Sequence, residues 1–314
     1  MAMKRFIPLL FATFSRCYPQ LSTEPPLSIE IDNSSLTTLG ASTVSRNVAP
    51  YDGNQTSYYL GYREADFAKP FAKFWNPYVE GISEEVQKGL SASPHAAELT
   101  FSAYDAADYL TRPGYLQLEN GWSLRSDGSL MIAIRTEMGN VTGEMYDWWF
   151  SWHLVDSSRY KLWAPIAHRY AWRSPETLVT NASAPTSSRY IGTYSFIDEY
   201  IGNNPGQLTV HFIDPATELG FNTSSYASTG IETIVTGRLD STGHTTNVTG
   251  HSYLMHQIRR KPDSNGTYEL RSRYFFEQNL GEEATHALLA HCNVEMKHLA
   301  SFLPELWAEF KDTI

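Results

Sequence analysis

The sequence predicts an α+β fold in which a curved antiparallel sheet encloses one long C-terminal helix. After Arg112-Pro113-Gly114, strand-like segments alternate with short turns, a pattern typical of an antiparallel meander. From Gly281 to Phe302 the apolar residues instead follow the period of a single long helix. Strands followed by a terminal helix are typical of α+β proteins. A sheet that curves around such a helix would enclose a cavity.

The N-terminal part of the chain predicts less regular structure. Lys4 and Arg5, followed by an apolar run, are typical of a signal peptide, which we place at residues 1–17. Residues 18 to about 55 are rich in Ser, Thr, Pro and Asn and predict a loose arm. Residues 64–92 are predicted to be helical, and their candidate buried positions are Phe67, Phe71, Phe74, Val79 and Val86. The chain therefore divides into residues 1–17, an N-terminal arm and helical segment at 18–110 that packs on the core, and a main domain at 111–314.

The main domain contains six candidate strands. Ser126-Asp127-Gly128 predicts a hairpin turn that leads into a strand from Leu130 to Glu137. The further candidates are residues 193–201, 207–213, 231–237, 251–260 and 267–277. After the long helix, Pro304 predicts the start of a short second helix, because proline is favoured in a first helical turn.

An aromatic stretch precedes most of these strands. It contains three tryptophans within five residues and a fourth shortly afterwards, and such side chains line either cores or ligand cavities. Periodicity alone does not separate a cavity wall from an aromatic core strand. The candidate cavity residues are Trp148, Trp149, Trp152 and Trp163.

One turn of the long helix carries candidate metal ligands. His291 and Glu295 lie one helical turn apart on a stripe that also includes His298. Two such residues can ligate a metal ion from a rigid element. The alternative is a hydrogen-bonded pair on a helix surface, which is the commoner arrangement. If Cys17 is removed with the signal peptide, Cys292 is the remaining cysteine, and it is interpreted as a small buried hydrophobe.

Strand alternation places further polar residues on apolar faces. Glu199 shares a face with Ile197 and Ile201, where a carboxylate needs a partner or a metal ion, unless the register turns it outward. Asp198, on the opposite face, is expected to be solvated.

His256 and Tyr274 are also predicted to point inward, where they would orient a substrate, act as acid or base, or be satisfied within the core. The same alternation places Arg271 and Arg273 on the outer face.

Composition excludes some classes of partner. A net charge of −10 and a pI of about 5.5 argue against binding to nucleic acid or to an anionic membrane surface. No apolar run approaches the ~20 residues of a membrane span. Together with the N-terminal signal, seven glycosylation sequons predict a secreted or secretory-pathway glycoprotein. They lie at Asn33, Asn54, Asn140, Asn181, Asn222, Asn247 and Asn265.

Several motifs together resemble the family of 2,4-diacetylphloroglucinol hydrolase and phloretin hydrolase. The matching segments include Gly114-Tyr115-Leu116, Trp148-Trp149-Phe150-Ser151-Trp152-His153, Arg159-Tyr160-Lys161-Leu162-Trp163, Ala167-His168, Glu199-Tyr200-Ile201-Gly202, Arg271-Ser272-Arg273 and His291-Cys292-Asn293-Val294-Glu295-Met296. The resemblance implies a Bet v 1-like helix-grip fold and makes residues 111–314 the metal-binding catalytic domain. It also implies a zinc ion, or another divalent transition metal, held by His168, Glu199, His291 and Glu295. Tyr160, His256 and Tyr274 match the family's catalytic, substrate-facing polar residues.

The resemblance implies hydrolysis of a carbon–carbon bond between an acyl group and a phenolic or 1,3-dicarbonyl-type ring, a retro-Claisen type of cleavage in secondary metabolism. The expected partner is an aromatic small molecule, and a homodimer is kept open. Two alternatives remain at this point. One is a pericyclase-like cyclase or isomerase of a polyketide-like compound in the same cavity. The other is a binding protein for an aromatic small molecule, because a fold does not determine a function.

Overall fold

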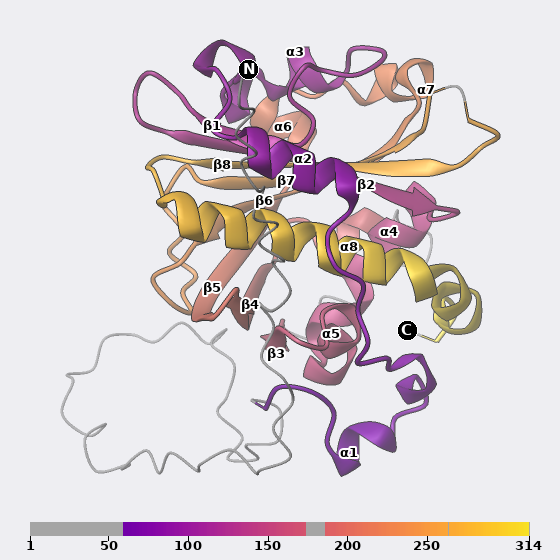
Figure 1. Cartoon of the computed structure of the whole chain (residues 1–314). Coiled ribbons are helices and arrows are strands. Elements are labelled where there is room, and N and C mark those ends of the chain that lie inside the picture. Colours follow the sequence, from indigo (N-terminus) through magenta and orange to yellow (C-terminus); the bar gives the residue numbers. More distant parts are fainter. Residues whose placement is uncertain (1–58, 174–185, 263, 314) are drawn as a thin grey trace, which may run out of the picture. The chain divides into compact units, whose positions relative to one another are not determined.

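The computed structural model describes residues 59–173, 186–262 and 264–313. The predicted signal peptide, the loose arm and the sequons at Asn33, Asn54 and Asn181 lie outside these residues. Within them, eight strands form one antiparallel sheet in the order β1-β2-β8-β7-β6-β5-β4-β3 (Figure 1). The strands are β1 (Gly121–Leu124), β2 (Leu130–Gly139), β3 (His168–Trp172), β4 (Tyr194–Ile201), β5 (Asn204–Ile213), β6 (Ile231–Asp240), β7 (Tyr253–Arg260) and β8 (Tyr268–Phe276). All six predicted strands are present, and β1 and β3 are additional.

Helices surround this sheet. The α-helices are α1 (Glu64–Phe67), α2 (Glu84–Ala92), α3 (Ala106–Leu110), α4 (Gly143–Trp152), α5 (Ser157–Trp163), α6 (Pro215–Leu219), α7 (Tyr226–Thr229) and α8 (Glu282–Phe310). Short 3₁₀ turns are η3 (Ala72–Phe74), η4 (Ala97–Leu99), η5 (Ala103–Asp105), η6 (His153–Val155), η8 (Thr186–Arg189) and η9 (Thr223–Ser225).

Two helix predictions need correction. The segment 64–92 is not one helical region but contains α1, η3 and α2, since Pro70 and Pro77 interrupt it, and Phe67 is exposed rather than buried. Pro304 does not start a second helix. It lies inside α8, and Leu303 and Leu306 beside it are buried in the main core.

The long helix α8 packs on one face of the sheet and builds the main core. Figure 1 shows α8, in yellow, crossing in front of the strands. Its buried residues Leu289, Met296 and Leu303 belong to the same apolar cluster as Ile132 of β2 and Ile258 of β7. This arrangement confirms the α+β helix-grip architecture.

The other face of the sheet is covered as well. Met131 and Phe275 of the sheet pack there with Phe101, Leu110 and Leu118 from the segment that precedes β1. A second buried apolar core therefore covers the outer face of the sheet.

Arg271 and Arg273 consequently do not face solvent as the alternation suggested. Both are fully buried and paired with Glu119, whose carboxylate receives hydrogen bonds from each guanidinium.

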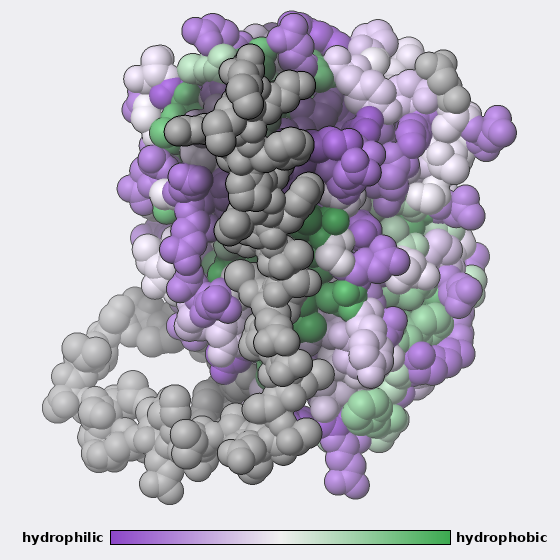
Figure 2. All heavy atoms as spheres, viewed as in Figure 1, coloured by the Kyte–Doolittle hydropathy of each residue, from purple (hydrophilic) through white to green (hydrophobic). Residues whose placement is uncertain are grey.

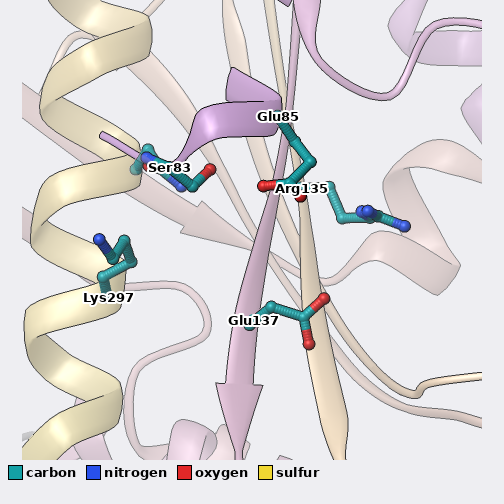
Figure 3. Close-up of a pocket in the computed structure, with 6 residues that line it drawn as sticks. Ser83, Glu85, Arg135, Glu137 and Lys297 are labelled. Carbon is teal, nitrogen blue, oxygen red and sulfur yellow. Dashed lines mark hydrogen bonds between the residues drawn. The ribbon is translucent and has the colours of Figure 1, made fainter. Parts of the chain in front are cut away.

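The molecular surface on the face shown in Figure 2 is largely hydrophilic, and hydrophobic residues gather near its centre and right side. A pocket of about 170 Å³ lies beside α8, with Lys297 from α8 and Arg135 and Glu137 from β2 on its walls (Figure 3). Among the residues that the structure describes, no helix combines the length and apolar character needed to cross a bilayer.

Candidate metal centre

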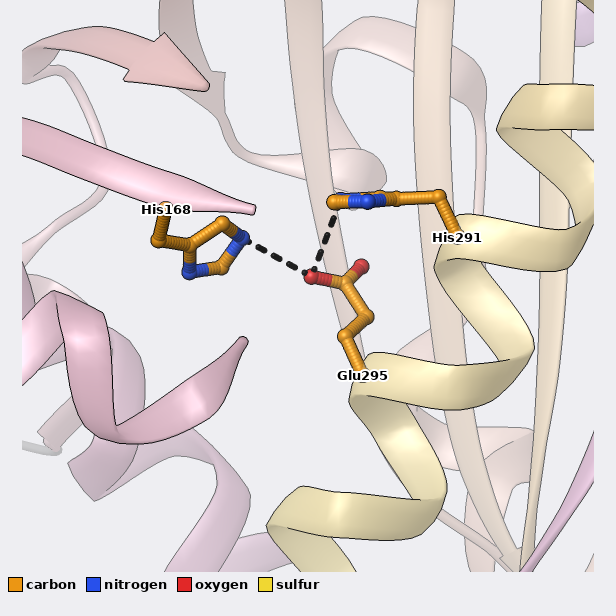
Figure 4. Close-up of side chains that lie close together, drawn as sticks. All are labelled: His168, His291 and Glu295. Atoms are coloured by element: carbon orange, nitrogen blue, oxygen red, sulfur yellow. Dashed lines mark ion pairs between the residues drawn. The ribbon is translucent and has the colours of Figure 1, made fainter. Parts of the chain in front are cut away.

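Three side chains from β3 and α8 converge inside the protein. Ligand-type atoms of His168, His291 and Glu295 all lie within 4.8 Å of one another. The Glu295 carboxylate oxygen Oε2 is 3.2 Å from Nε2 of His168 and 3.4 Å from Nε2 of His291 (Figure 4). His291 and Glu295 occupy successive turns of α8, as their spacing predicts, and both turn toward the first residue of β3.

Glu199 brings a second carboxylate to the same place. It pairs with His168 across the β3–β4 ladder, so the backbone register puts the two side chains beside each other. Its Oε2 lies 3.4 Å from Nε2 of His168 and 3.8 Å from Nε2 of His291. Tyr160 of α5 donates its hydroxyl proton to this same oxygen at 2.5 Å. All four predicted ligand residues are thus neighbours, and Glu199 faces inward.

A hydrogen bond orients the imidazole of His168. Its Nδ1 lies 2.9 Å from the backbone carbonyl oxygen of Tyr160, which can only accept a hydrogen bond, so Nδ1 is the donor. The other ring nitrogen, Nε2, is buried and faces the carboxylate oxygens of Glu295 and Glu199 at 3.2 and 3.4 Å. A histidine that donates a hydrogen bond from one ring nitrogen and turns the other toward acidic side chains has the orientation typical of a metal ligand.

The charges at the centre favour a cation. Burial would raise the pKa of Glu295, but His291 and His168 lower it to about 2. Burial would lower the pKa of His291, but Glu295 and Glu199 raise it to about 9. The two carboxylates therefore stabilise positive charge between them. Two imidazole nitrogens and two carboxylate oxygens form a donor set that suits Zn²⁺, and the oxygen share also suits iron or manganese.

The centre is nearly closed to solvent but not sealed. The side chain of His168 is fully buried, whereas those of His291 and Glu199 remain 9% and 12% exposed.

His256 and Tyr274 lie near this centre on neighbouring strands. Both are buried on the sheet face that carries the main core, and their ring centroids are 5.8 Å apart. Burial raises the pKa of Tyr274 well above its usual value, so its hydroxyl stays protonated. Burial lowers the pKa of His256 to about 4, so its imidazole is neutral near pH 7. Nδ1 of His256 lies 2.8 Å from the hydroxyl oxygen of Ser272, which fixes the ring.

Comparison with known proteins identifies the family. The family model described as the DAPG hydrolase PhiG domain matches residues 101–308 of the 314 residues. The chain belongs to this family. It is 28% identical over 267 residues to 2,4-diacetylphloroglucinol hydrolase of Pseudomonas protegens, which covers 77% of this chain and 85% of the relative. It is 27% identical over 271 residues to phloretin hydrolase of Eubacterium ramulus, which covers 81% of this chain and 95% of the relative.

Membership of the DAPG hydrolase family confirms the resemblance and the expectation of an enzyme of the hydrolase class. Among solved structures, that of Ara h 8.0201 is similar with a TM-score of 0.34 and 8% identity, covering 57% of this chain and 99% of that one. The assignment of the helix-grip architecture rests on the strand order and on α8.

In this DAPG hydrolase family member the tryptophan-rich run forms the helix α4, so the alternative of an aromatic strand is wrong. Trp148 and Trp152 stack at 5.0 Å, and Trp152 reaches Phe310 of α8 at 6.1 Å, which places both in the main core. Trp163 belongs to the same core, and its ring centroid lies 5.3 Å from that of His168. All four predicted cavity tryptophans, including Trp149, are buried, and their contact with a substrate stays a prediction.

The sequence analysis did not predict the burial of two polar residues. Asp198, expected to be solvated, is buried with Oδ1 2.8 Å from Nε2 of His244, because the segment after β6 covers that face of β4. His153, at the end of the aromatic run, is fully buried beside the metal centre. The sequence feature that could have identified His153 is its position as a polar residue within an aromatic motif.

Proposed function

We propose that this chain is a metal-dependent hydrolase that cleaves the carbon–carbon bond between an acyl group and a phenolic or 1,3-dicarbonyl-type ring. Zn²⁺ is the proposed metal ion, held by His168, Glu199, His291 and Glu295. The convergence of these four side chains carries the proposal. Family membership supports it, since relatives at 27–28% identity are named for hydrolysis of 2,4-diacetylphloroglucinol and of phloretin.

The proposed reaction consumes one water molecule. The water oxygen bonds to the acyl carbonyl carbon, and the bond from that carbon to the ring carbon breaks. The ring carbon keeps the bonding electron pair and takes up a proton, which gives a free ring and a carboxylic acid. A divalent cation held at this centre would supply Lewis acidity, which would polarise a carbonyl or make water more acidic.

The side chains near the centre suit the proton transfers of this reaction. Tyr274 keeps its proton and can donate a hydrogen bond to a carbonyl or phenolic oxygen. His256 is neutral, so it can accept a proton from the attacking water and pass it to the ring carbon. Tyr160 holds the carboxylate of Glu199 in place through its hydroxyl. We assign Tyr274 and His256 to substrate and proton handling, and Tyr160 to positioning as well as substrate contact.

The proposed substrate is a neutral or phenolic aromatic ketone. Tyr274 and Trp163 are buried aromatic side chains near the centre, and such side chains suit contact with a planar ring. A net charge of −10 disfavours phosphorylated substrates.

Turnover of acylphenols and β-diketones in ¹⁸O-labelled water tests the proposed function. Incorporation of label into a released carboxylic acid is the expected result, and the variant Glu295→Gln should abolish it. A product isomeric with the substrate and free of label would overturn hydrolysis in favour of a cyclase or isomerase. Saturable binding without any turnover across the series would instead indicate a binding protein.

A further inference from the structure

Four aromatic rings form a stack that ends on the metal ligand His168. We call Trp149, His153, Tyr160 and His168 the ring column. Successive centroids are 4.5, 5.9 and 3.7 Å apart, with interplanar angles of 11°, 18° and 7°. All four side chains are at most 1% exposed. Because the rings come from α4, η6, α5 and β3, the column joins four separate elements at one point.

Trp163 closes one side of the ring column. Its ring stands nearly perpendicular to every member, at 87° to Trp149, 78° to His153, 76° to Tyr160 and 80° to His168. Edge-to-face and offset-stacked contacts are the preferred geometries of aromatic pairs, because the ring edge is positive and the face negative. The column is therefore held along its axis and from the side.

Tyr160 is the member that touches the ligands. Its ring lies flat on His168 at 3.7 Å, its carbonyl oxygen accepts the Nδ1 proton of His168, and its hydroxyl binds Glu199. A tilt of this one ring would therefore disturb two of the four ligands. The ring of His153 is the other parallel neighbour of Tyr160, with centroids 5.9 Å apart.

One ring nitrogen of His153 forms a hydrogen bond and the other does not. Its Nδ1 donates to the carbonyl oxygen of Trp149 at 2.6 Å. Its Nε2 is buried and lacks a hydrogen-bond partner within the described part of the chain. Burial keeps the pKa of His153 well below its usual value, so the ring is neutral. A buried acceptor without a partner costs stability, so hydrogen bonding at Nε2 does not explain the presence of an imidazole here.

We propose that His153 is a positioning residue of the metal centre, whose ring holds Tyr160 flat against His168 and so fixes the direction of Nε2 of His168. This inference rests on the proposed function, because it requires a metal ion at the centre. Replacement of a residue that contacts a metal ligand, rather than the metal ion itself, commonly lowers metal affinity by ~10–100-fold.

Co²⁺ binding by two variants of His153 distinguishes the contribution of its ring from that of its hydrogen bond. His153→Asn keeps a side-chain N–H near the carbonyl of Trp149 but removes the ring, whereas His153→Phe keeps a ring and removes the hydrogen bond. His298→Leu is the matched control, since His298 is also buried with Nε2 lacking a partner in the described structure but lies outside the column. Full-length variants are checked by circular dichroism, loaded with Co²⁺, and measured by visible absorption and chelator competition.

The expected result is that His153→Asn weakens Co²⁺ binding about 10-fold or more and changes the ligand-field spectrum. His153→Phe and His298→Leu should both resemble the wild type. Equal binding and spectra in His153→Asn and wild type would overturn the role of His153 but leave the proposed function intact. A loss confined to His153→Phe, or shared by all three variants, would also overturn it. Failure of the wild type to bind Co²⁺ would refute the proposed function itself.

Discussion

Replacement of Glu119 by Gln should destabilise the protein strongly. Glu119 is 8% exposed, and its carboxylate lies between two fully buried arginines. Arg271 donates from Nη2 to Oε1 at 2.6 Å and from Nε to Oε2 at 3.1 Å, and Arg273 donates from Nη2 to Oε2 at 2.5 Å. The neutral amide of Glu119→Gln would leave both guanidinium groups without their counter-charge.

The structure gives the size of this effect. Burial would raise the pKa of Glu119, but Arg273 and Arg271 lower it from 4.5 to about 2. At ~1.36 kcal/mol per pH unit, this difference corresponds to about 3 kcal/mol of stability near pH 7. The value agrees with the ~3–5 kcal/mol lost when one partner of a buried ion pair is removed. Because the folded pKa is the lower one, the contribution is complete above pH 4.5 and is lost as the pH falls toward 2.

Urea unfolding of wild type and Glu119→Gln measures this contribution. The difference in unfolding free energy should be about 3 kcal/mol at about pH 7 and fall to about 1 kcal/mol at about pH 3. Glu137→Gln is the control, because Glu137 is 56% exposed and its ion pair with Lys261 should contribute only ~0–1 kcal/mol. A loss in Glu119→Gln no larger than in the control, or one that does not change with pH, would refute the reasoning.

Three further predictions follow from other parts of the molecule. Tyr160→Phe should lower kcat and weaken metal binding by about 10-fold, because the carboxylate of Glu199 loses its hydroxyl donor, and equal metal affinity in chelator competition would contradict this. Gly89→Ala should lower the unfolding free energy by ~1–3 kcal/mol, because the added Cβ would clash with the backbone carbonyl of Asn120, and an unchanged urea midpoint would contradict it. Protein from its native source should carry glycans on sequons whose asparagines are exposed, and an intact mass equal to the bare polypeptide would argue against secretory passage. The described ones are Asn140, Asn222, Asn247 and Asn265.

Local periodicity was enough to predict that His291 and Glu295 share one side of α8. His291 and Glu295 are four residues apart, and a helix of 3.6 residues per turn places them on one side whatever surrounds it. The partnership of His168 with Glu199 could not be obtained this way. It depends on the register of β3 and β4, and β3 is a five-residue strand with no alternation to reveal it.

The alternation of polar and apolar residues gave wrong predictions of solvent exposure where both faces of the sheet are buried. The nine residues of β8 include eight buried ones, so polar side chains such as Arg271 and Arg273 do not mark a solvent face. Their partner, Glu119, precedes β1 and is 152 residues away from Arg271 along the chain, beyond the reach of local patterns. For the same reason the sequence placed Asp198 in solvent, although the segment carrying His244 covers it.

Metal content is the measurement that tests the central proposal most directly. Purified full-length protein, dialysed against metal-free buffer, is analysed for zinc, iron and manganese together with His291→Ala, Glu295→Gln and the control His298→Leu. The four converging ligands predict about one zinc ion per chain in the wild type and the control, and a sharp loss in the two ligand variants with the fold retained. A wild-type stoichiometry near zero, or equal metal content in the wild type and both ligand variants, would contradict the account.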